Sequence, residues 1–245
     1  MKHQSNILAL KYRPKDFSDL IGQEYLVDTI QKSIQLNKIP NAYIFTGIRG
    51  VGKTTTARIV AKMLNCTSFD TSNKPDLLNC DQAKAITEDR HPDVIEIDAA
   101  SNTSVENARE IIENVKYNPV LGKYKVYIID EVHMLSKSAF NALLKTLEEP
   151  PPHSKFIFAT TEISKVPITI LSRCQRFDLR RIDKKVLSLF LETIANKENI
   201  LIEKEALNLI VKASDGSVRD ALSILDQANV FKSVSYTHLT LPTTD

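Results

Sequence analysis

A short glycine-rich segment sets the tightest limit on how this chain can fold. Residues 47–54 have the sequence GIRGVGKT and fit the pattern G-x-x-x-x-G-K-[ST]. The apolar run at 42–46 before this segment is typical of a buried strand, and residues 54–65 after it have helical spacing. A glycine-rich turn in this position lets successive backbone N–H groups converge on phosphate oxygens. The context favours a phosphate-binding loop over a turn without a ligand.

Each residue type in the loop has its own chemical task. Lys53 would neutralise the terminal phosphates, and the Thr54 hydroxyl would ligate Mg²⁺. We therefore expect the chain to bind a nucleoside triphosphate. The residues expected to contact it in this segment are Gly47, Arg49, Gly50, Val51, Gly52, Lys53, Thr54 and Thr55.

Length and composition are those of an ordinary globular protein. The 245 residues suffice for one large and one small domain, and 42% of them are hydrophobic. No apolar run is long enough to span a bilayer, and no basic leader with an apolar centre is present, so we expect a cytoplasmic protein without a membrane partner. A formal net charge of +2 does not by itself indicate nucleic-acid binding, and three cysteines do not indicate a disulfide framework.

Strand-like and helix-like segments alternate through the first 180 residues. Strands are expected at about 42–46, 94–97, 125–130, 155–160 and 176–179, separated by segments of helical period. This order predicts a parallel sheet with crossover helices. Thr103 to Glu106 have the form of a capping box for one of these helices, and the prolines at 150–152 end another.

From residue 181 onward the pattern is helical alone. Three amphipathic segments, at 183–196, 203–213 and 217–231, predict a small all-helical domain. Residues 233–245 carry no charge before the final Asp and have no helical period, so we interpret them as a disordered or non-native tail. The predicted divisions are therefore 1–180, 181–232 and 233–245.

Two adjacent carboxylates follow another apolar run. Residues 126–129, VYII, precede Asp130 and Glu131. At a strand end near a phosphate-binding loop, one carboxylate holds Mg²⁺ and its neighbour polarises the attacking water. We assign Asp130 to the metal side, together with Thr54, and Glu131 as the catalytic base. A solvated acidic strand end is the alternative.

Three further residues are candidates on weaker patterns. Thr161 follows the strand at 155–160 and would sense the γ-phosphate, although β-branched residues are also common at strand ends for packing reasons. Arg173, in the sequence SRC, would bring a planar cation to the transition state or be an ordinary surface charge. Arg219 lies in the first turn of the last helix, where the macrodipole disfavours a cation, and this indicates an anionic partner, with Asp220 as the local alternative.

Together these motifs resemble the ATPase core of the tau/gamma family of bacterial DNA polymerase III, the AAA+ motors of sliding-clamp loaders. The resemblance spans residues 8 to about 231. Besides the loop, it rests on KYRP at 11–14, IGQ at 21–23, DVIEIDAAS at 93–101, DEVHML at 130–135, NALLKTLEEP at 141–150, SRC at 172–174 and GSVRDAL at 216–222.

The resemblance implies an α/β fold of the P-loop NTPase (AAA+) type, a parallel sheet flanked by helices, followed by a small all-helical lid. ATP and Mg²⁺ would be its ligands. Thr161 would be the first sensor, Arg219 the second sensor, which binds the nucleotide, and Arg173 the finger that acts on a neighbouring subunit's nucleotide. The residues implied to line the adenine pocket are Tyr12, Arg13, Pro14, Ile21 and Gly22.

The resemblance also implies partners. Family members work in a pentameric ring with delta, delta-prime and further tau/gamma copies, open the sliding clamp and place it on primed DNA. They belong to a DNA-directed DNA polymerase, a nucleotidyltransferase, without carrying the polymerase site. The family's third helical domain, the collar, has no counterpart after Phe231, so we interpret the chain as motor and lid.

The sequence departs from the family in one region. Members carry four zinc-binding cysteines after the P-loop helix; here Cys66 and Cys80 match two of them, while Leu77 and Ala83 stand at the other two by spacing. Two thiolates do not close a tetrahedral zinc site, so we expect no structural zinc. The residues that would complete a site in their place are Asp76, Asp81 or His91.

Two other functions fit parts of the pattern. One is a different AAA+ subunit, such as delta-prime or a branch-migration helicase, but the intact loop together with Arg173 favours the tau/gamma identity. The other is a nucleotide-gated scaffold that binds ATP with little turnover. Glu131 argues against the scaffold, because a protein that only binds ATP needs no positioned base.

Overall fold

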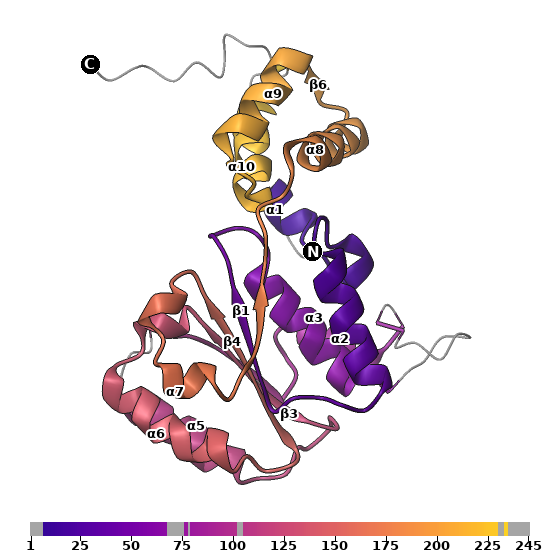
Figure 1. The fold of residues 1–245 in the computed structure, drawn as a ribbon. Helices are drawn as coiled ribbons and strands as arrows, with labels where there is room; N and C mark the ends of the chain where they lie inside the picture. The colour runs from indigo at the N-terminus through magenta and orange to yellow at the C-terminus, as the bar shows by residue number, and fades with distance from the viewer. Residues whose placement is uncertain (1–6, 68–75, 78, 102–104, 230–232, 235–245) are drawn as a thin grey trace. The chain divides into compact units, whose positions relative to one another are not determined.

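The computed structural model describes residues 7–67, 76–77, 79–101, 105–229 and 233–234. They belong to two compact units (Figure 1). Unit 1 comprises 1–14, 48–52 and 180–245, and unit 2 comprises 15–47 and 53–179. The division at 179/180 falls beside the expected one at 180/181. The sequence did not predict that residues 1–14 and 48–52 would group with the helical lid.

Unit 2 is built on a five-stranded sheet of order β2-β3-β4-β1-β5, in which every neighbouring pair is parallel. This confirms the predicted α/β fold. The strand bounds differ by one residue at most from the expected ones. They are β1 (Ala42–Thr46), β2 (Val94–Asp98), β3 (Lys125–Asp130), β4 (Ser154–Thr160) and β5 (Gln175–Asp178).

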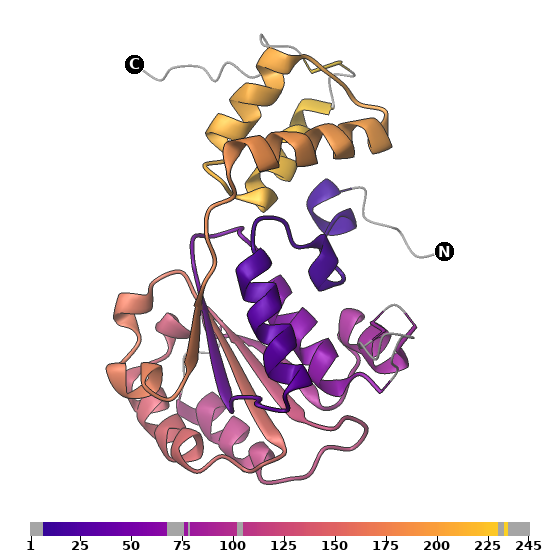
Figure 2. The same cartoon turned by 45° about the vertical axis from the view of Figure 1, so that its right-hand side comes forward.

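Helices cover both faces of this sheet. The pair α2 and α3 lies on one face, and α5 and α6 lie on the other (Figures 1 and 2). The helices of unit 2 are α2 (Glu24–Gln35), α3 (Lys53–Asn65), α4 (Asp81–Thr87), α5 (Val105–Val115), α6 (Lys137–Glu148) and α7 (Ile168–Leu171), with short 3₁₀ turns η1 (Phe17–Asp19), η2 (Val132–Met134) and η3 (Ile163–Lys165). Thr103 and Ser104 of the capping box expected at the start of α5 lie outside the described residues.

The central strands read as continuous apolar runs because both of their faces are covered. All five residues of β1 and all seven of β4 are buried. One side of the core joins Phe156 and Phe158 of β4 to Phe140 and Leu143 of α6. Parallel strands buried on both faces are expected to show this pattern rather than alternation.

Unit 1 is mainly helical. Its helices are α1 (Leu8–Lys11), α8 (Lys184–Glu198), α9 (Lys204–Ala213) and α10 (Val218–Asn229). The expectation that strands cease after residue 181 is wrong, since β6 (Leu201–Ile202) and β7 (Ser233–Val234) form a two-stranded parallel sheet. Of the tail expected at 233–245, the structure describes only these two paired residues; 235–245 lie outside the described part.

The N-terminal helix of unit 1 is held to α8 by polar contacts. Lys11 Nζ lies 2.6 Å from a Glu198 carboxylate oxygen, and the Tyr12 hydroxyl donates a short hydrogen bond to the same carboxylate. That bond, with burial and the negative charge of Glu198, raises the pKa of Tyr12 to about 12. These contacts help to hold residues 7–14 to the lid. Among the described residues, no helix has the length and apolar character that crossing a membrane requires.

Candidate nucleotide-binding and catalytic site

The sheet register brings three of the predicted motifs to one edge. Thr46, the last residue of β1, is paired with Thr160 at the end of β4, and β3 runs on the other side of β4. Since all strands are parallel, the segments that follow β1, β3 and β4 leave the sheet at its carboxyl edge. The sequence motifs after these strands, GIRGVGKT, DEVH and TE, therefore meet there.

The loop after β1 has the backbone of a phosphate-binding loop. Gly47, Gly50 and Gly52 have φ angles of 148°, 79° and 103°, which residues with a side chain rarely adopt. Lys53, the first residue of α3, is buried, and its Nζ donates to the Gly47 carbonyl at 3.0 Å. Burial lowers the pKa of Lys53, while Glu131 and Asp130 raise it. A buried ammonium beside the amide-rich loop fits the triphosphate of a nucleotide.

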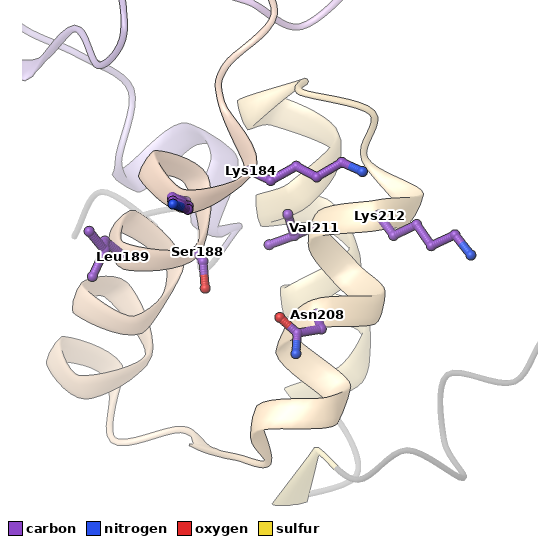
Figure 3. Close-up of a pocket in the computed structure, with 7 residues that line it drawn as sticks. Lys184, Ser188, Leu189, Asn208, Val211 and Lys212 are labelled. Atoms are coloured by element: carbon purple, nitrogen blue, oxygen red, sulfur yellow. The ribbon is translucent and has the colours of Figure 1, made fainter.

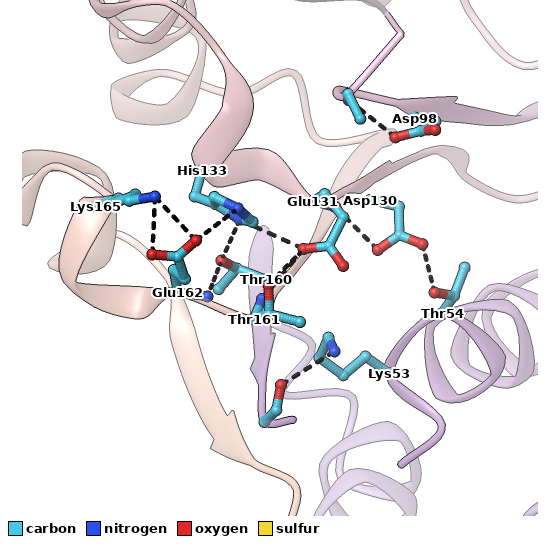
Figure 4. A network of polar contacts seen from close by, with 12 residues as sticks. Lys53, Thr54, Asp98, Asp130, Glu131, His133, Thr160, Thr161, Glu162 and Lys165 are labelled. Atoms are coloured by element: carbon cyan, nitrogen blue, oxygen red, sulfur yellow. Dashed lines mark hydrogen bonds and ion pairs between the residues drawn. The ribbon is translucent and has the colours of Figure 1, made fainter. Parts of the chain in front are cut away.

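Thr54 and Asp130 form the expected metal-side pair. The Thr54 hydroxyl donates to Asp130 Oδ2 at 2.5 Å, although 76 residues separate them (Figure 4). One hydroxyl and one carboxylate fit Mg²⁺, which is usually held by one or two such protein oxygens together with substrate phosphates and water. In the described part of the chain, no group of three or more His, Cys, Asp or Glu side chains is arranged to hold a metal by itself.

Glu131 is the most constrained carboxylate of the site. Its backbone is left-handed, with φ 46°, and its N–H donates to Asp130 Oδ1 at 2.9 Å. Thr161 donates to Glu131 Oε2 twice, from its backbone N–H at 3.2 Å and from its hydroxyl at 3.0 Å. Thr161, the expected phosphate sensor, is thus hydrogen-bonded to Glu131, the expected base. A non-glycine residue in this conformation stores strain of the kind found at functional sites.

Sequence reasoning gave no role to His133, which extends this network. The buried ring lies with Nδ1 3.0 Å from the Thr160 hydroxyl and 3.4 Å from Glu131 Oε2. Its Nε2 lies 3.5 Å from Glu162, whose pKa is lowered chiefly by the hydrogen bond from Lys165, while desolvation opposes this effect and electrostatic interactions with Lys165 and His133 add to it (Figure 4). His133 follows the acidic pair by two residues, and this closeness was the one sequence signal available.

Arg173, the expected finger, is engaged within its own unit. Its guanidinium lies 2.5 Å from Glu148 at the end of α6 and donates to the Thr169 carbonyl at 2.6 Å. About a third of its side chain is exposed. The structure contains one chain, so the expected action on a neighbouring subunit stays a prediction.

The remaining nucleotide-binding candidates are distributed between the two units. Tyr12, Arg13 and Pro14 belong to unit 1, and Ile21 and Gly22 belong to unit 2, so the expected adenine pocket stays a prediction. Arg219 in unit 1 is exposed. Within the described residues, it forms no ion pair with Asp220, the local alternative partner.

The two cysteines at family zinc positions are buried, and so are the residues at the other two positions. Cys66 and Cys80 are 8% and 0% exposed, and Leu77 and Ala83 are 7% and 1% exposed. The four positions thus contribute to packing around α3 and α4. The absence of zinc stays a prediction, which metal analysis of protein purified without chelator would check; one zinc per chain would contradict it.

A shallow groove of about 560 Å³ lies elsewhere in unit 1, between α8 and α9 (Figure 3). Val211 and Leu189 give it apolar walls, and Ser188 and Asn208 face across it. Its remaining lining residues are Lys184, Lys185 and Lys212. None of the predicted site residues lines this groove, so it does not compete with the strand-edge site as the nucleotide-binding candidate.

Two family models match the chain, one over a long segment and one over a shorter segment that follows it. Residues 22–183 match the family described as DNA polymerase III, delta subunit. Residues 187–232 match the family described as DNA polymerase III clamp loader subunit, ATPase lid domain.

Similar proteins with curated descriptions are DNA polymerase III subunits. The tau subunit of Salmonella typhimurium is 51% identical over 222 residues, which cover 91% of this chain and 34% of that protein. The tau subunit of Bacillus subtilis is 50% identical over 220 residues, 90% of this chain and 39% of that protein. The gamma subunit of Buchnera aphidicola subsp. Baizongia pistaciae is 48% identical, over 91% of this chain and 60% of that protein. The chain thus spans about a third of the tau subunits it matches.

Among solved structures, the chain is similar to the Thermotoga maritima RuvB Holliday junction branch migration motor. The TM-score is 0.66 at 19% identity, covering 93% of this chain and 70% of that one. At this identity the likeness supports the fold.

Proposed function

Because this chain belongs to the clamp-loader ATPase family of bacterial DNA polymerase III, we propose that it is the ATP-driven motor that loads the sliding clamp onto primed DNA. The observation that carries the proposal is the meeting of Lys53, the Thr54–Asp130 pair and Glu131 at one edge of the sheet. A protein that only binds nucleotide would need the first three residues and not the fourth.

For binding, we assign the phosphates to the loop at 47–54. Its N–H groups would donate hydrogen bonds to the phosphate oxygens, and the Lys53 ammonium would neutralise part of their charge. Thr54 and Asp130 would hold Mg²⁺, which supplies positive charge opposite the transferring phosphoryl group. The buried position of Lys53 strengthens its interaction with the phosphates.

For hydrolysis, we assign Glu131 as the base that orients the attacking water and accepts its proton. The contacts of Thr161 and His133 within the described residues are to Oε2, so we assign Oε1 to the water. Thr161 then acts as a positioning residue that holds the carboxylate, in addition to any contact with the γ-phosphate. Positioned general bases contribute about 10²- to 10⁴-fold to rate.

The partners follow from the family and from Arg173. We propose assembly with delta, delta-prime and further tau/gamma copies, binding of the sliding clamp and primed DNA, and a cytoplasmic location. For Arg173 to act on a neighbour's nucleotide, its guanidinium must leave Glu148, which holds it at 2.5 Å. Ring assembly would supply the competing anion.

The test is ATP turnover by this chain mixed with delta, delta-prime and clamp, with and without primed DNA. Stimulation of turnover by primed DNA supports a motor. ATP binding without DNA-stimulated turnover would instead favour a nucleotide-gated scaffold. The Glu131→Gln variant in the same mixture controls for turnover by a contaminating ATPase.

A further inference from the structure

The tip of the phosphate-binding loop touches the first turn of α10 inside unit 1. The Arg219 backbone N–H donates to the Gly50 carbonyl at 3.3 Å. The Ser217 hydroxyl accepts from the Asp220 N–H at 3.2 Å. The first N–H groups of a helix have no acceptor within the helix. The loop carbonyl therefore complements Ser217 as a second cap of α10.

The same contact leaves no space for a side chain on the loop. A Cβ added at Gly50 would lie 2.1 Å from Ser217 Oγ and 3.2 Å from Arg219 Cβ. Ser217 is 1% exposed, so its hydroxyl is confined between the loop and its own helix. The close approach needs glycine at position 50 for a reason separate from phosphate binding.

Arg219 is the residue whose position depends most directly on this contact. Its backbone N–H is tied to the loop, while its side chain is exposed. A shift of the loop tip would therefore carry the start of α10 with it. An anion bound in the loop and the backbone of Arg219 would therefore keep the same relative position, from which the guanidinium could reach the anion.

We propose that Ser217 is a positioning residue of the nucleotide site, which together with the Gly50 carbonyl fixes the start of α10, and hence Arg219, on the phosphate-binding loop. This proposal rests on the nucleotide-binding role given above and adds a residue to it. The alternative is that Ser217 only caps its helix, as Ser136 does for α6 by accepting from the Ala139 N–H at 3.2 Å.

The two ideas differ for variants that keep the cap. Ser217→Thr keeps the hydroxyl and adds a methyl group to a side chain that is 1% exposed, and we expect this overpacking to displace the loop tip. Ser217→Gly removes the hydroxyl, and glycine is itself a tolerated N-cap. If Ser217 only caps α10, Ser217→Gly should bind ATP like the wild type, and so should Ser136→Gly, whereas a positioning role predicts weaker binding by Ser217→Gly.

The experiment is calorimetric titration of the full chain with ATP and Mg²⁺, with thermal unfolding of each variant as a check on folding. We expect Ser217→Thr to weaken ATP binding by about tenfold. The free-energy cost of overpacking a close contact is similar in size to the free-energy change that corresponds to a tenfold loss of affinity. Each variant should still unfold in one cooperative transition, which shows that it is folded when it is titrated.

Gly50→Ala should weaken ATP binding further, because alanine rarely adopts this positive φ and its Cβ would clash with the Ser217 hydroxyl. Adding Ser217→Gly to Gly50→Ala should restore part of the affinity, since the atom at 2.1 Å is then absent. Restoration stays partial because the φ of 79° and the nearby Arg219 Cβ remain.

Two results would overturn the proposal. One is wild-type affinity for ATP in Ser217→Thr. The other is a double variant that binds ATP no better than Gly50→Ala alone. The proposed function is tested separately, by DNA-stimulated turnover of the wild type, so the two can fail independently.

Discussion

At the scale of single residues, Glu131 shows what a motif does and does not determine. The sequence predicts it as the base from its place after an apolar strand and beside Asp130. Its two bonds from Thr161 come from the residue that follows β4, 30 residues away in sequence. Local sequence patterns predict which residue carries the chemical group, whereas contacts with distant segments orient its side chain.

We expect Lys53→Ala to abolish ATP binding, with a loss of about 100-fold or more. The variant removes a buried cation from the loop and leaves phosphate oxygens without a charged partner, which costs more than a neutral hydrogen bond. Calorimetric titration with ATP measures the effect. Lys123→Ala, which removes an exposed lysine from another loop, is the matched control and should bind like the wild type.

Glu131→Gln separates binding from chemistry. The amide keeps the shape of the carboxylate but cannot accept the proton, so we expect ATP binding near that of the wild type and turnover in the assembled ring lower by about 10²- to 10⁴-fold. Glu113→Gln, on the exposed surface of α5, should turn over normally. Wild-type turnover by Glu131→Gln would show that another group is the base.

At the scale of secondary-structure elements, the sequence predicted the strands of unit 2 to within a residue. Continuous apolar runs followed by charged or glycine-rich turns make such strands recognisable. The order β2-β3-β4-β1-β5 was out of reach, because strand order depends on packing between distant segments. The pair β6 and β7 was missed since two residues carry no periodicity. His133 was missed because its partners Thr160 and Glu162 lie on another segment.

One buried carboxylate organises the connection that leads into β3. Asp93 is 1% exposed and accepts from the N–H groups of Val120, Leu121 and Gly122, each at 2.7 Å. Burial alone would raise the pKa of Asp93, but these three donors and His91 outweigh it, so its pKa lies below the ordinary value. The Asp93 carboxylate thus holds the loop that precedes β3 through three hydrogen bonds.

We expect Asp93→Asn to lower the free energy of unfolding at pH 7 by about 1.5–3 kcal/mol, because its bonds lose their charge. A carboxyl whose pKa is depressed by folding stabilises the protein above its unfolded pKa, and this contribution is lost as pH falls through the folded value. The difference in the free energy of unfolding between Asp93→Asn and the wild type should thus persist at pH 5 and become smaller below about pH 4. Urea unfolding across this range measures it. Asp28→Asn on the exposed side of α2 is the control, and a difference that persisted unchanged at pH 3 would contradict the assignment.

At the scale of the whole molecule, Arg173 connects one subunit to the next in the proposed ring. Its guanidinium is neutralised by Glu148 in the single chain. The chain alone then has the proposed phosphate-binding loop, metal carboxylate and base, but no cation from a neighbour. Fingers supplied by a second subunit are worth about 10³- to 10⁵-fold in rate.

We therefore expect the chain alone to bind ATP and hydrolyse it very slowly, and Arg173→Ala to leave this binding almost unchanged. In the assembled ring, Arg173→Ala should reduce turnover by about 10³-fold or more. The informative measurement mixes subunits: an Arg173→Ala subunit should silence the adjacent intact site and spare its own. Weaker ATP binding by the Arg173→Ala chain alone would show that the arginine acts within its own subunit.

Unit 1 consists of three separate segments of the chain, so a single cleavage does not separate it from unit 2. Residues 7–14 and 48–52 pack with the helices that follow residue 180, so the chain passes between the two units at 14/15, 47/48, 52/53 and 179/180. A protease that cleaves near residue 180 would break one connection and leave the other segments in place. We expect the two products to stay together after cleavage and to elute as one species until a denaturant separates them. The compact unit that contains the helical lid is thus built from segments that are distant in sequence, among them residues 7–14 and 48–52.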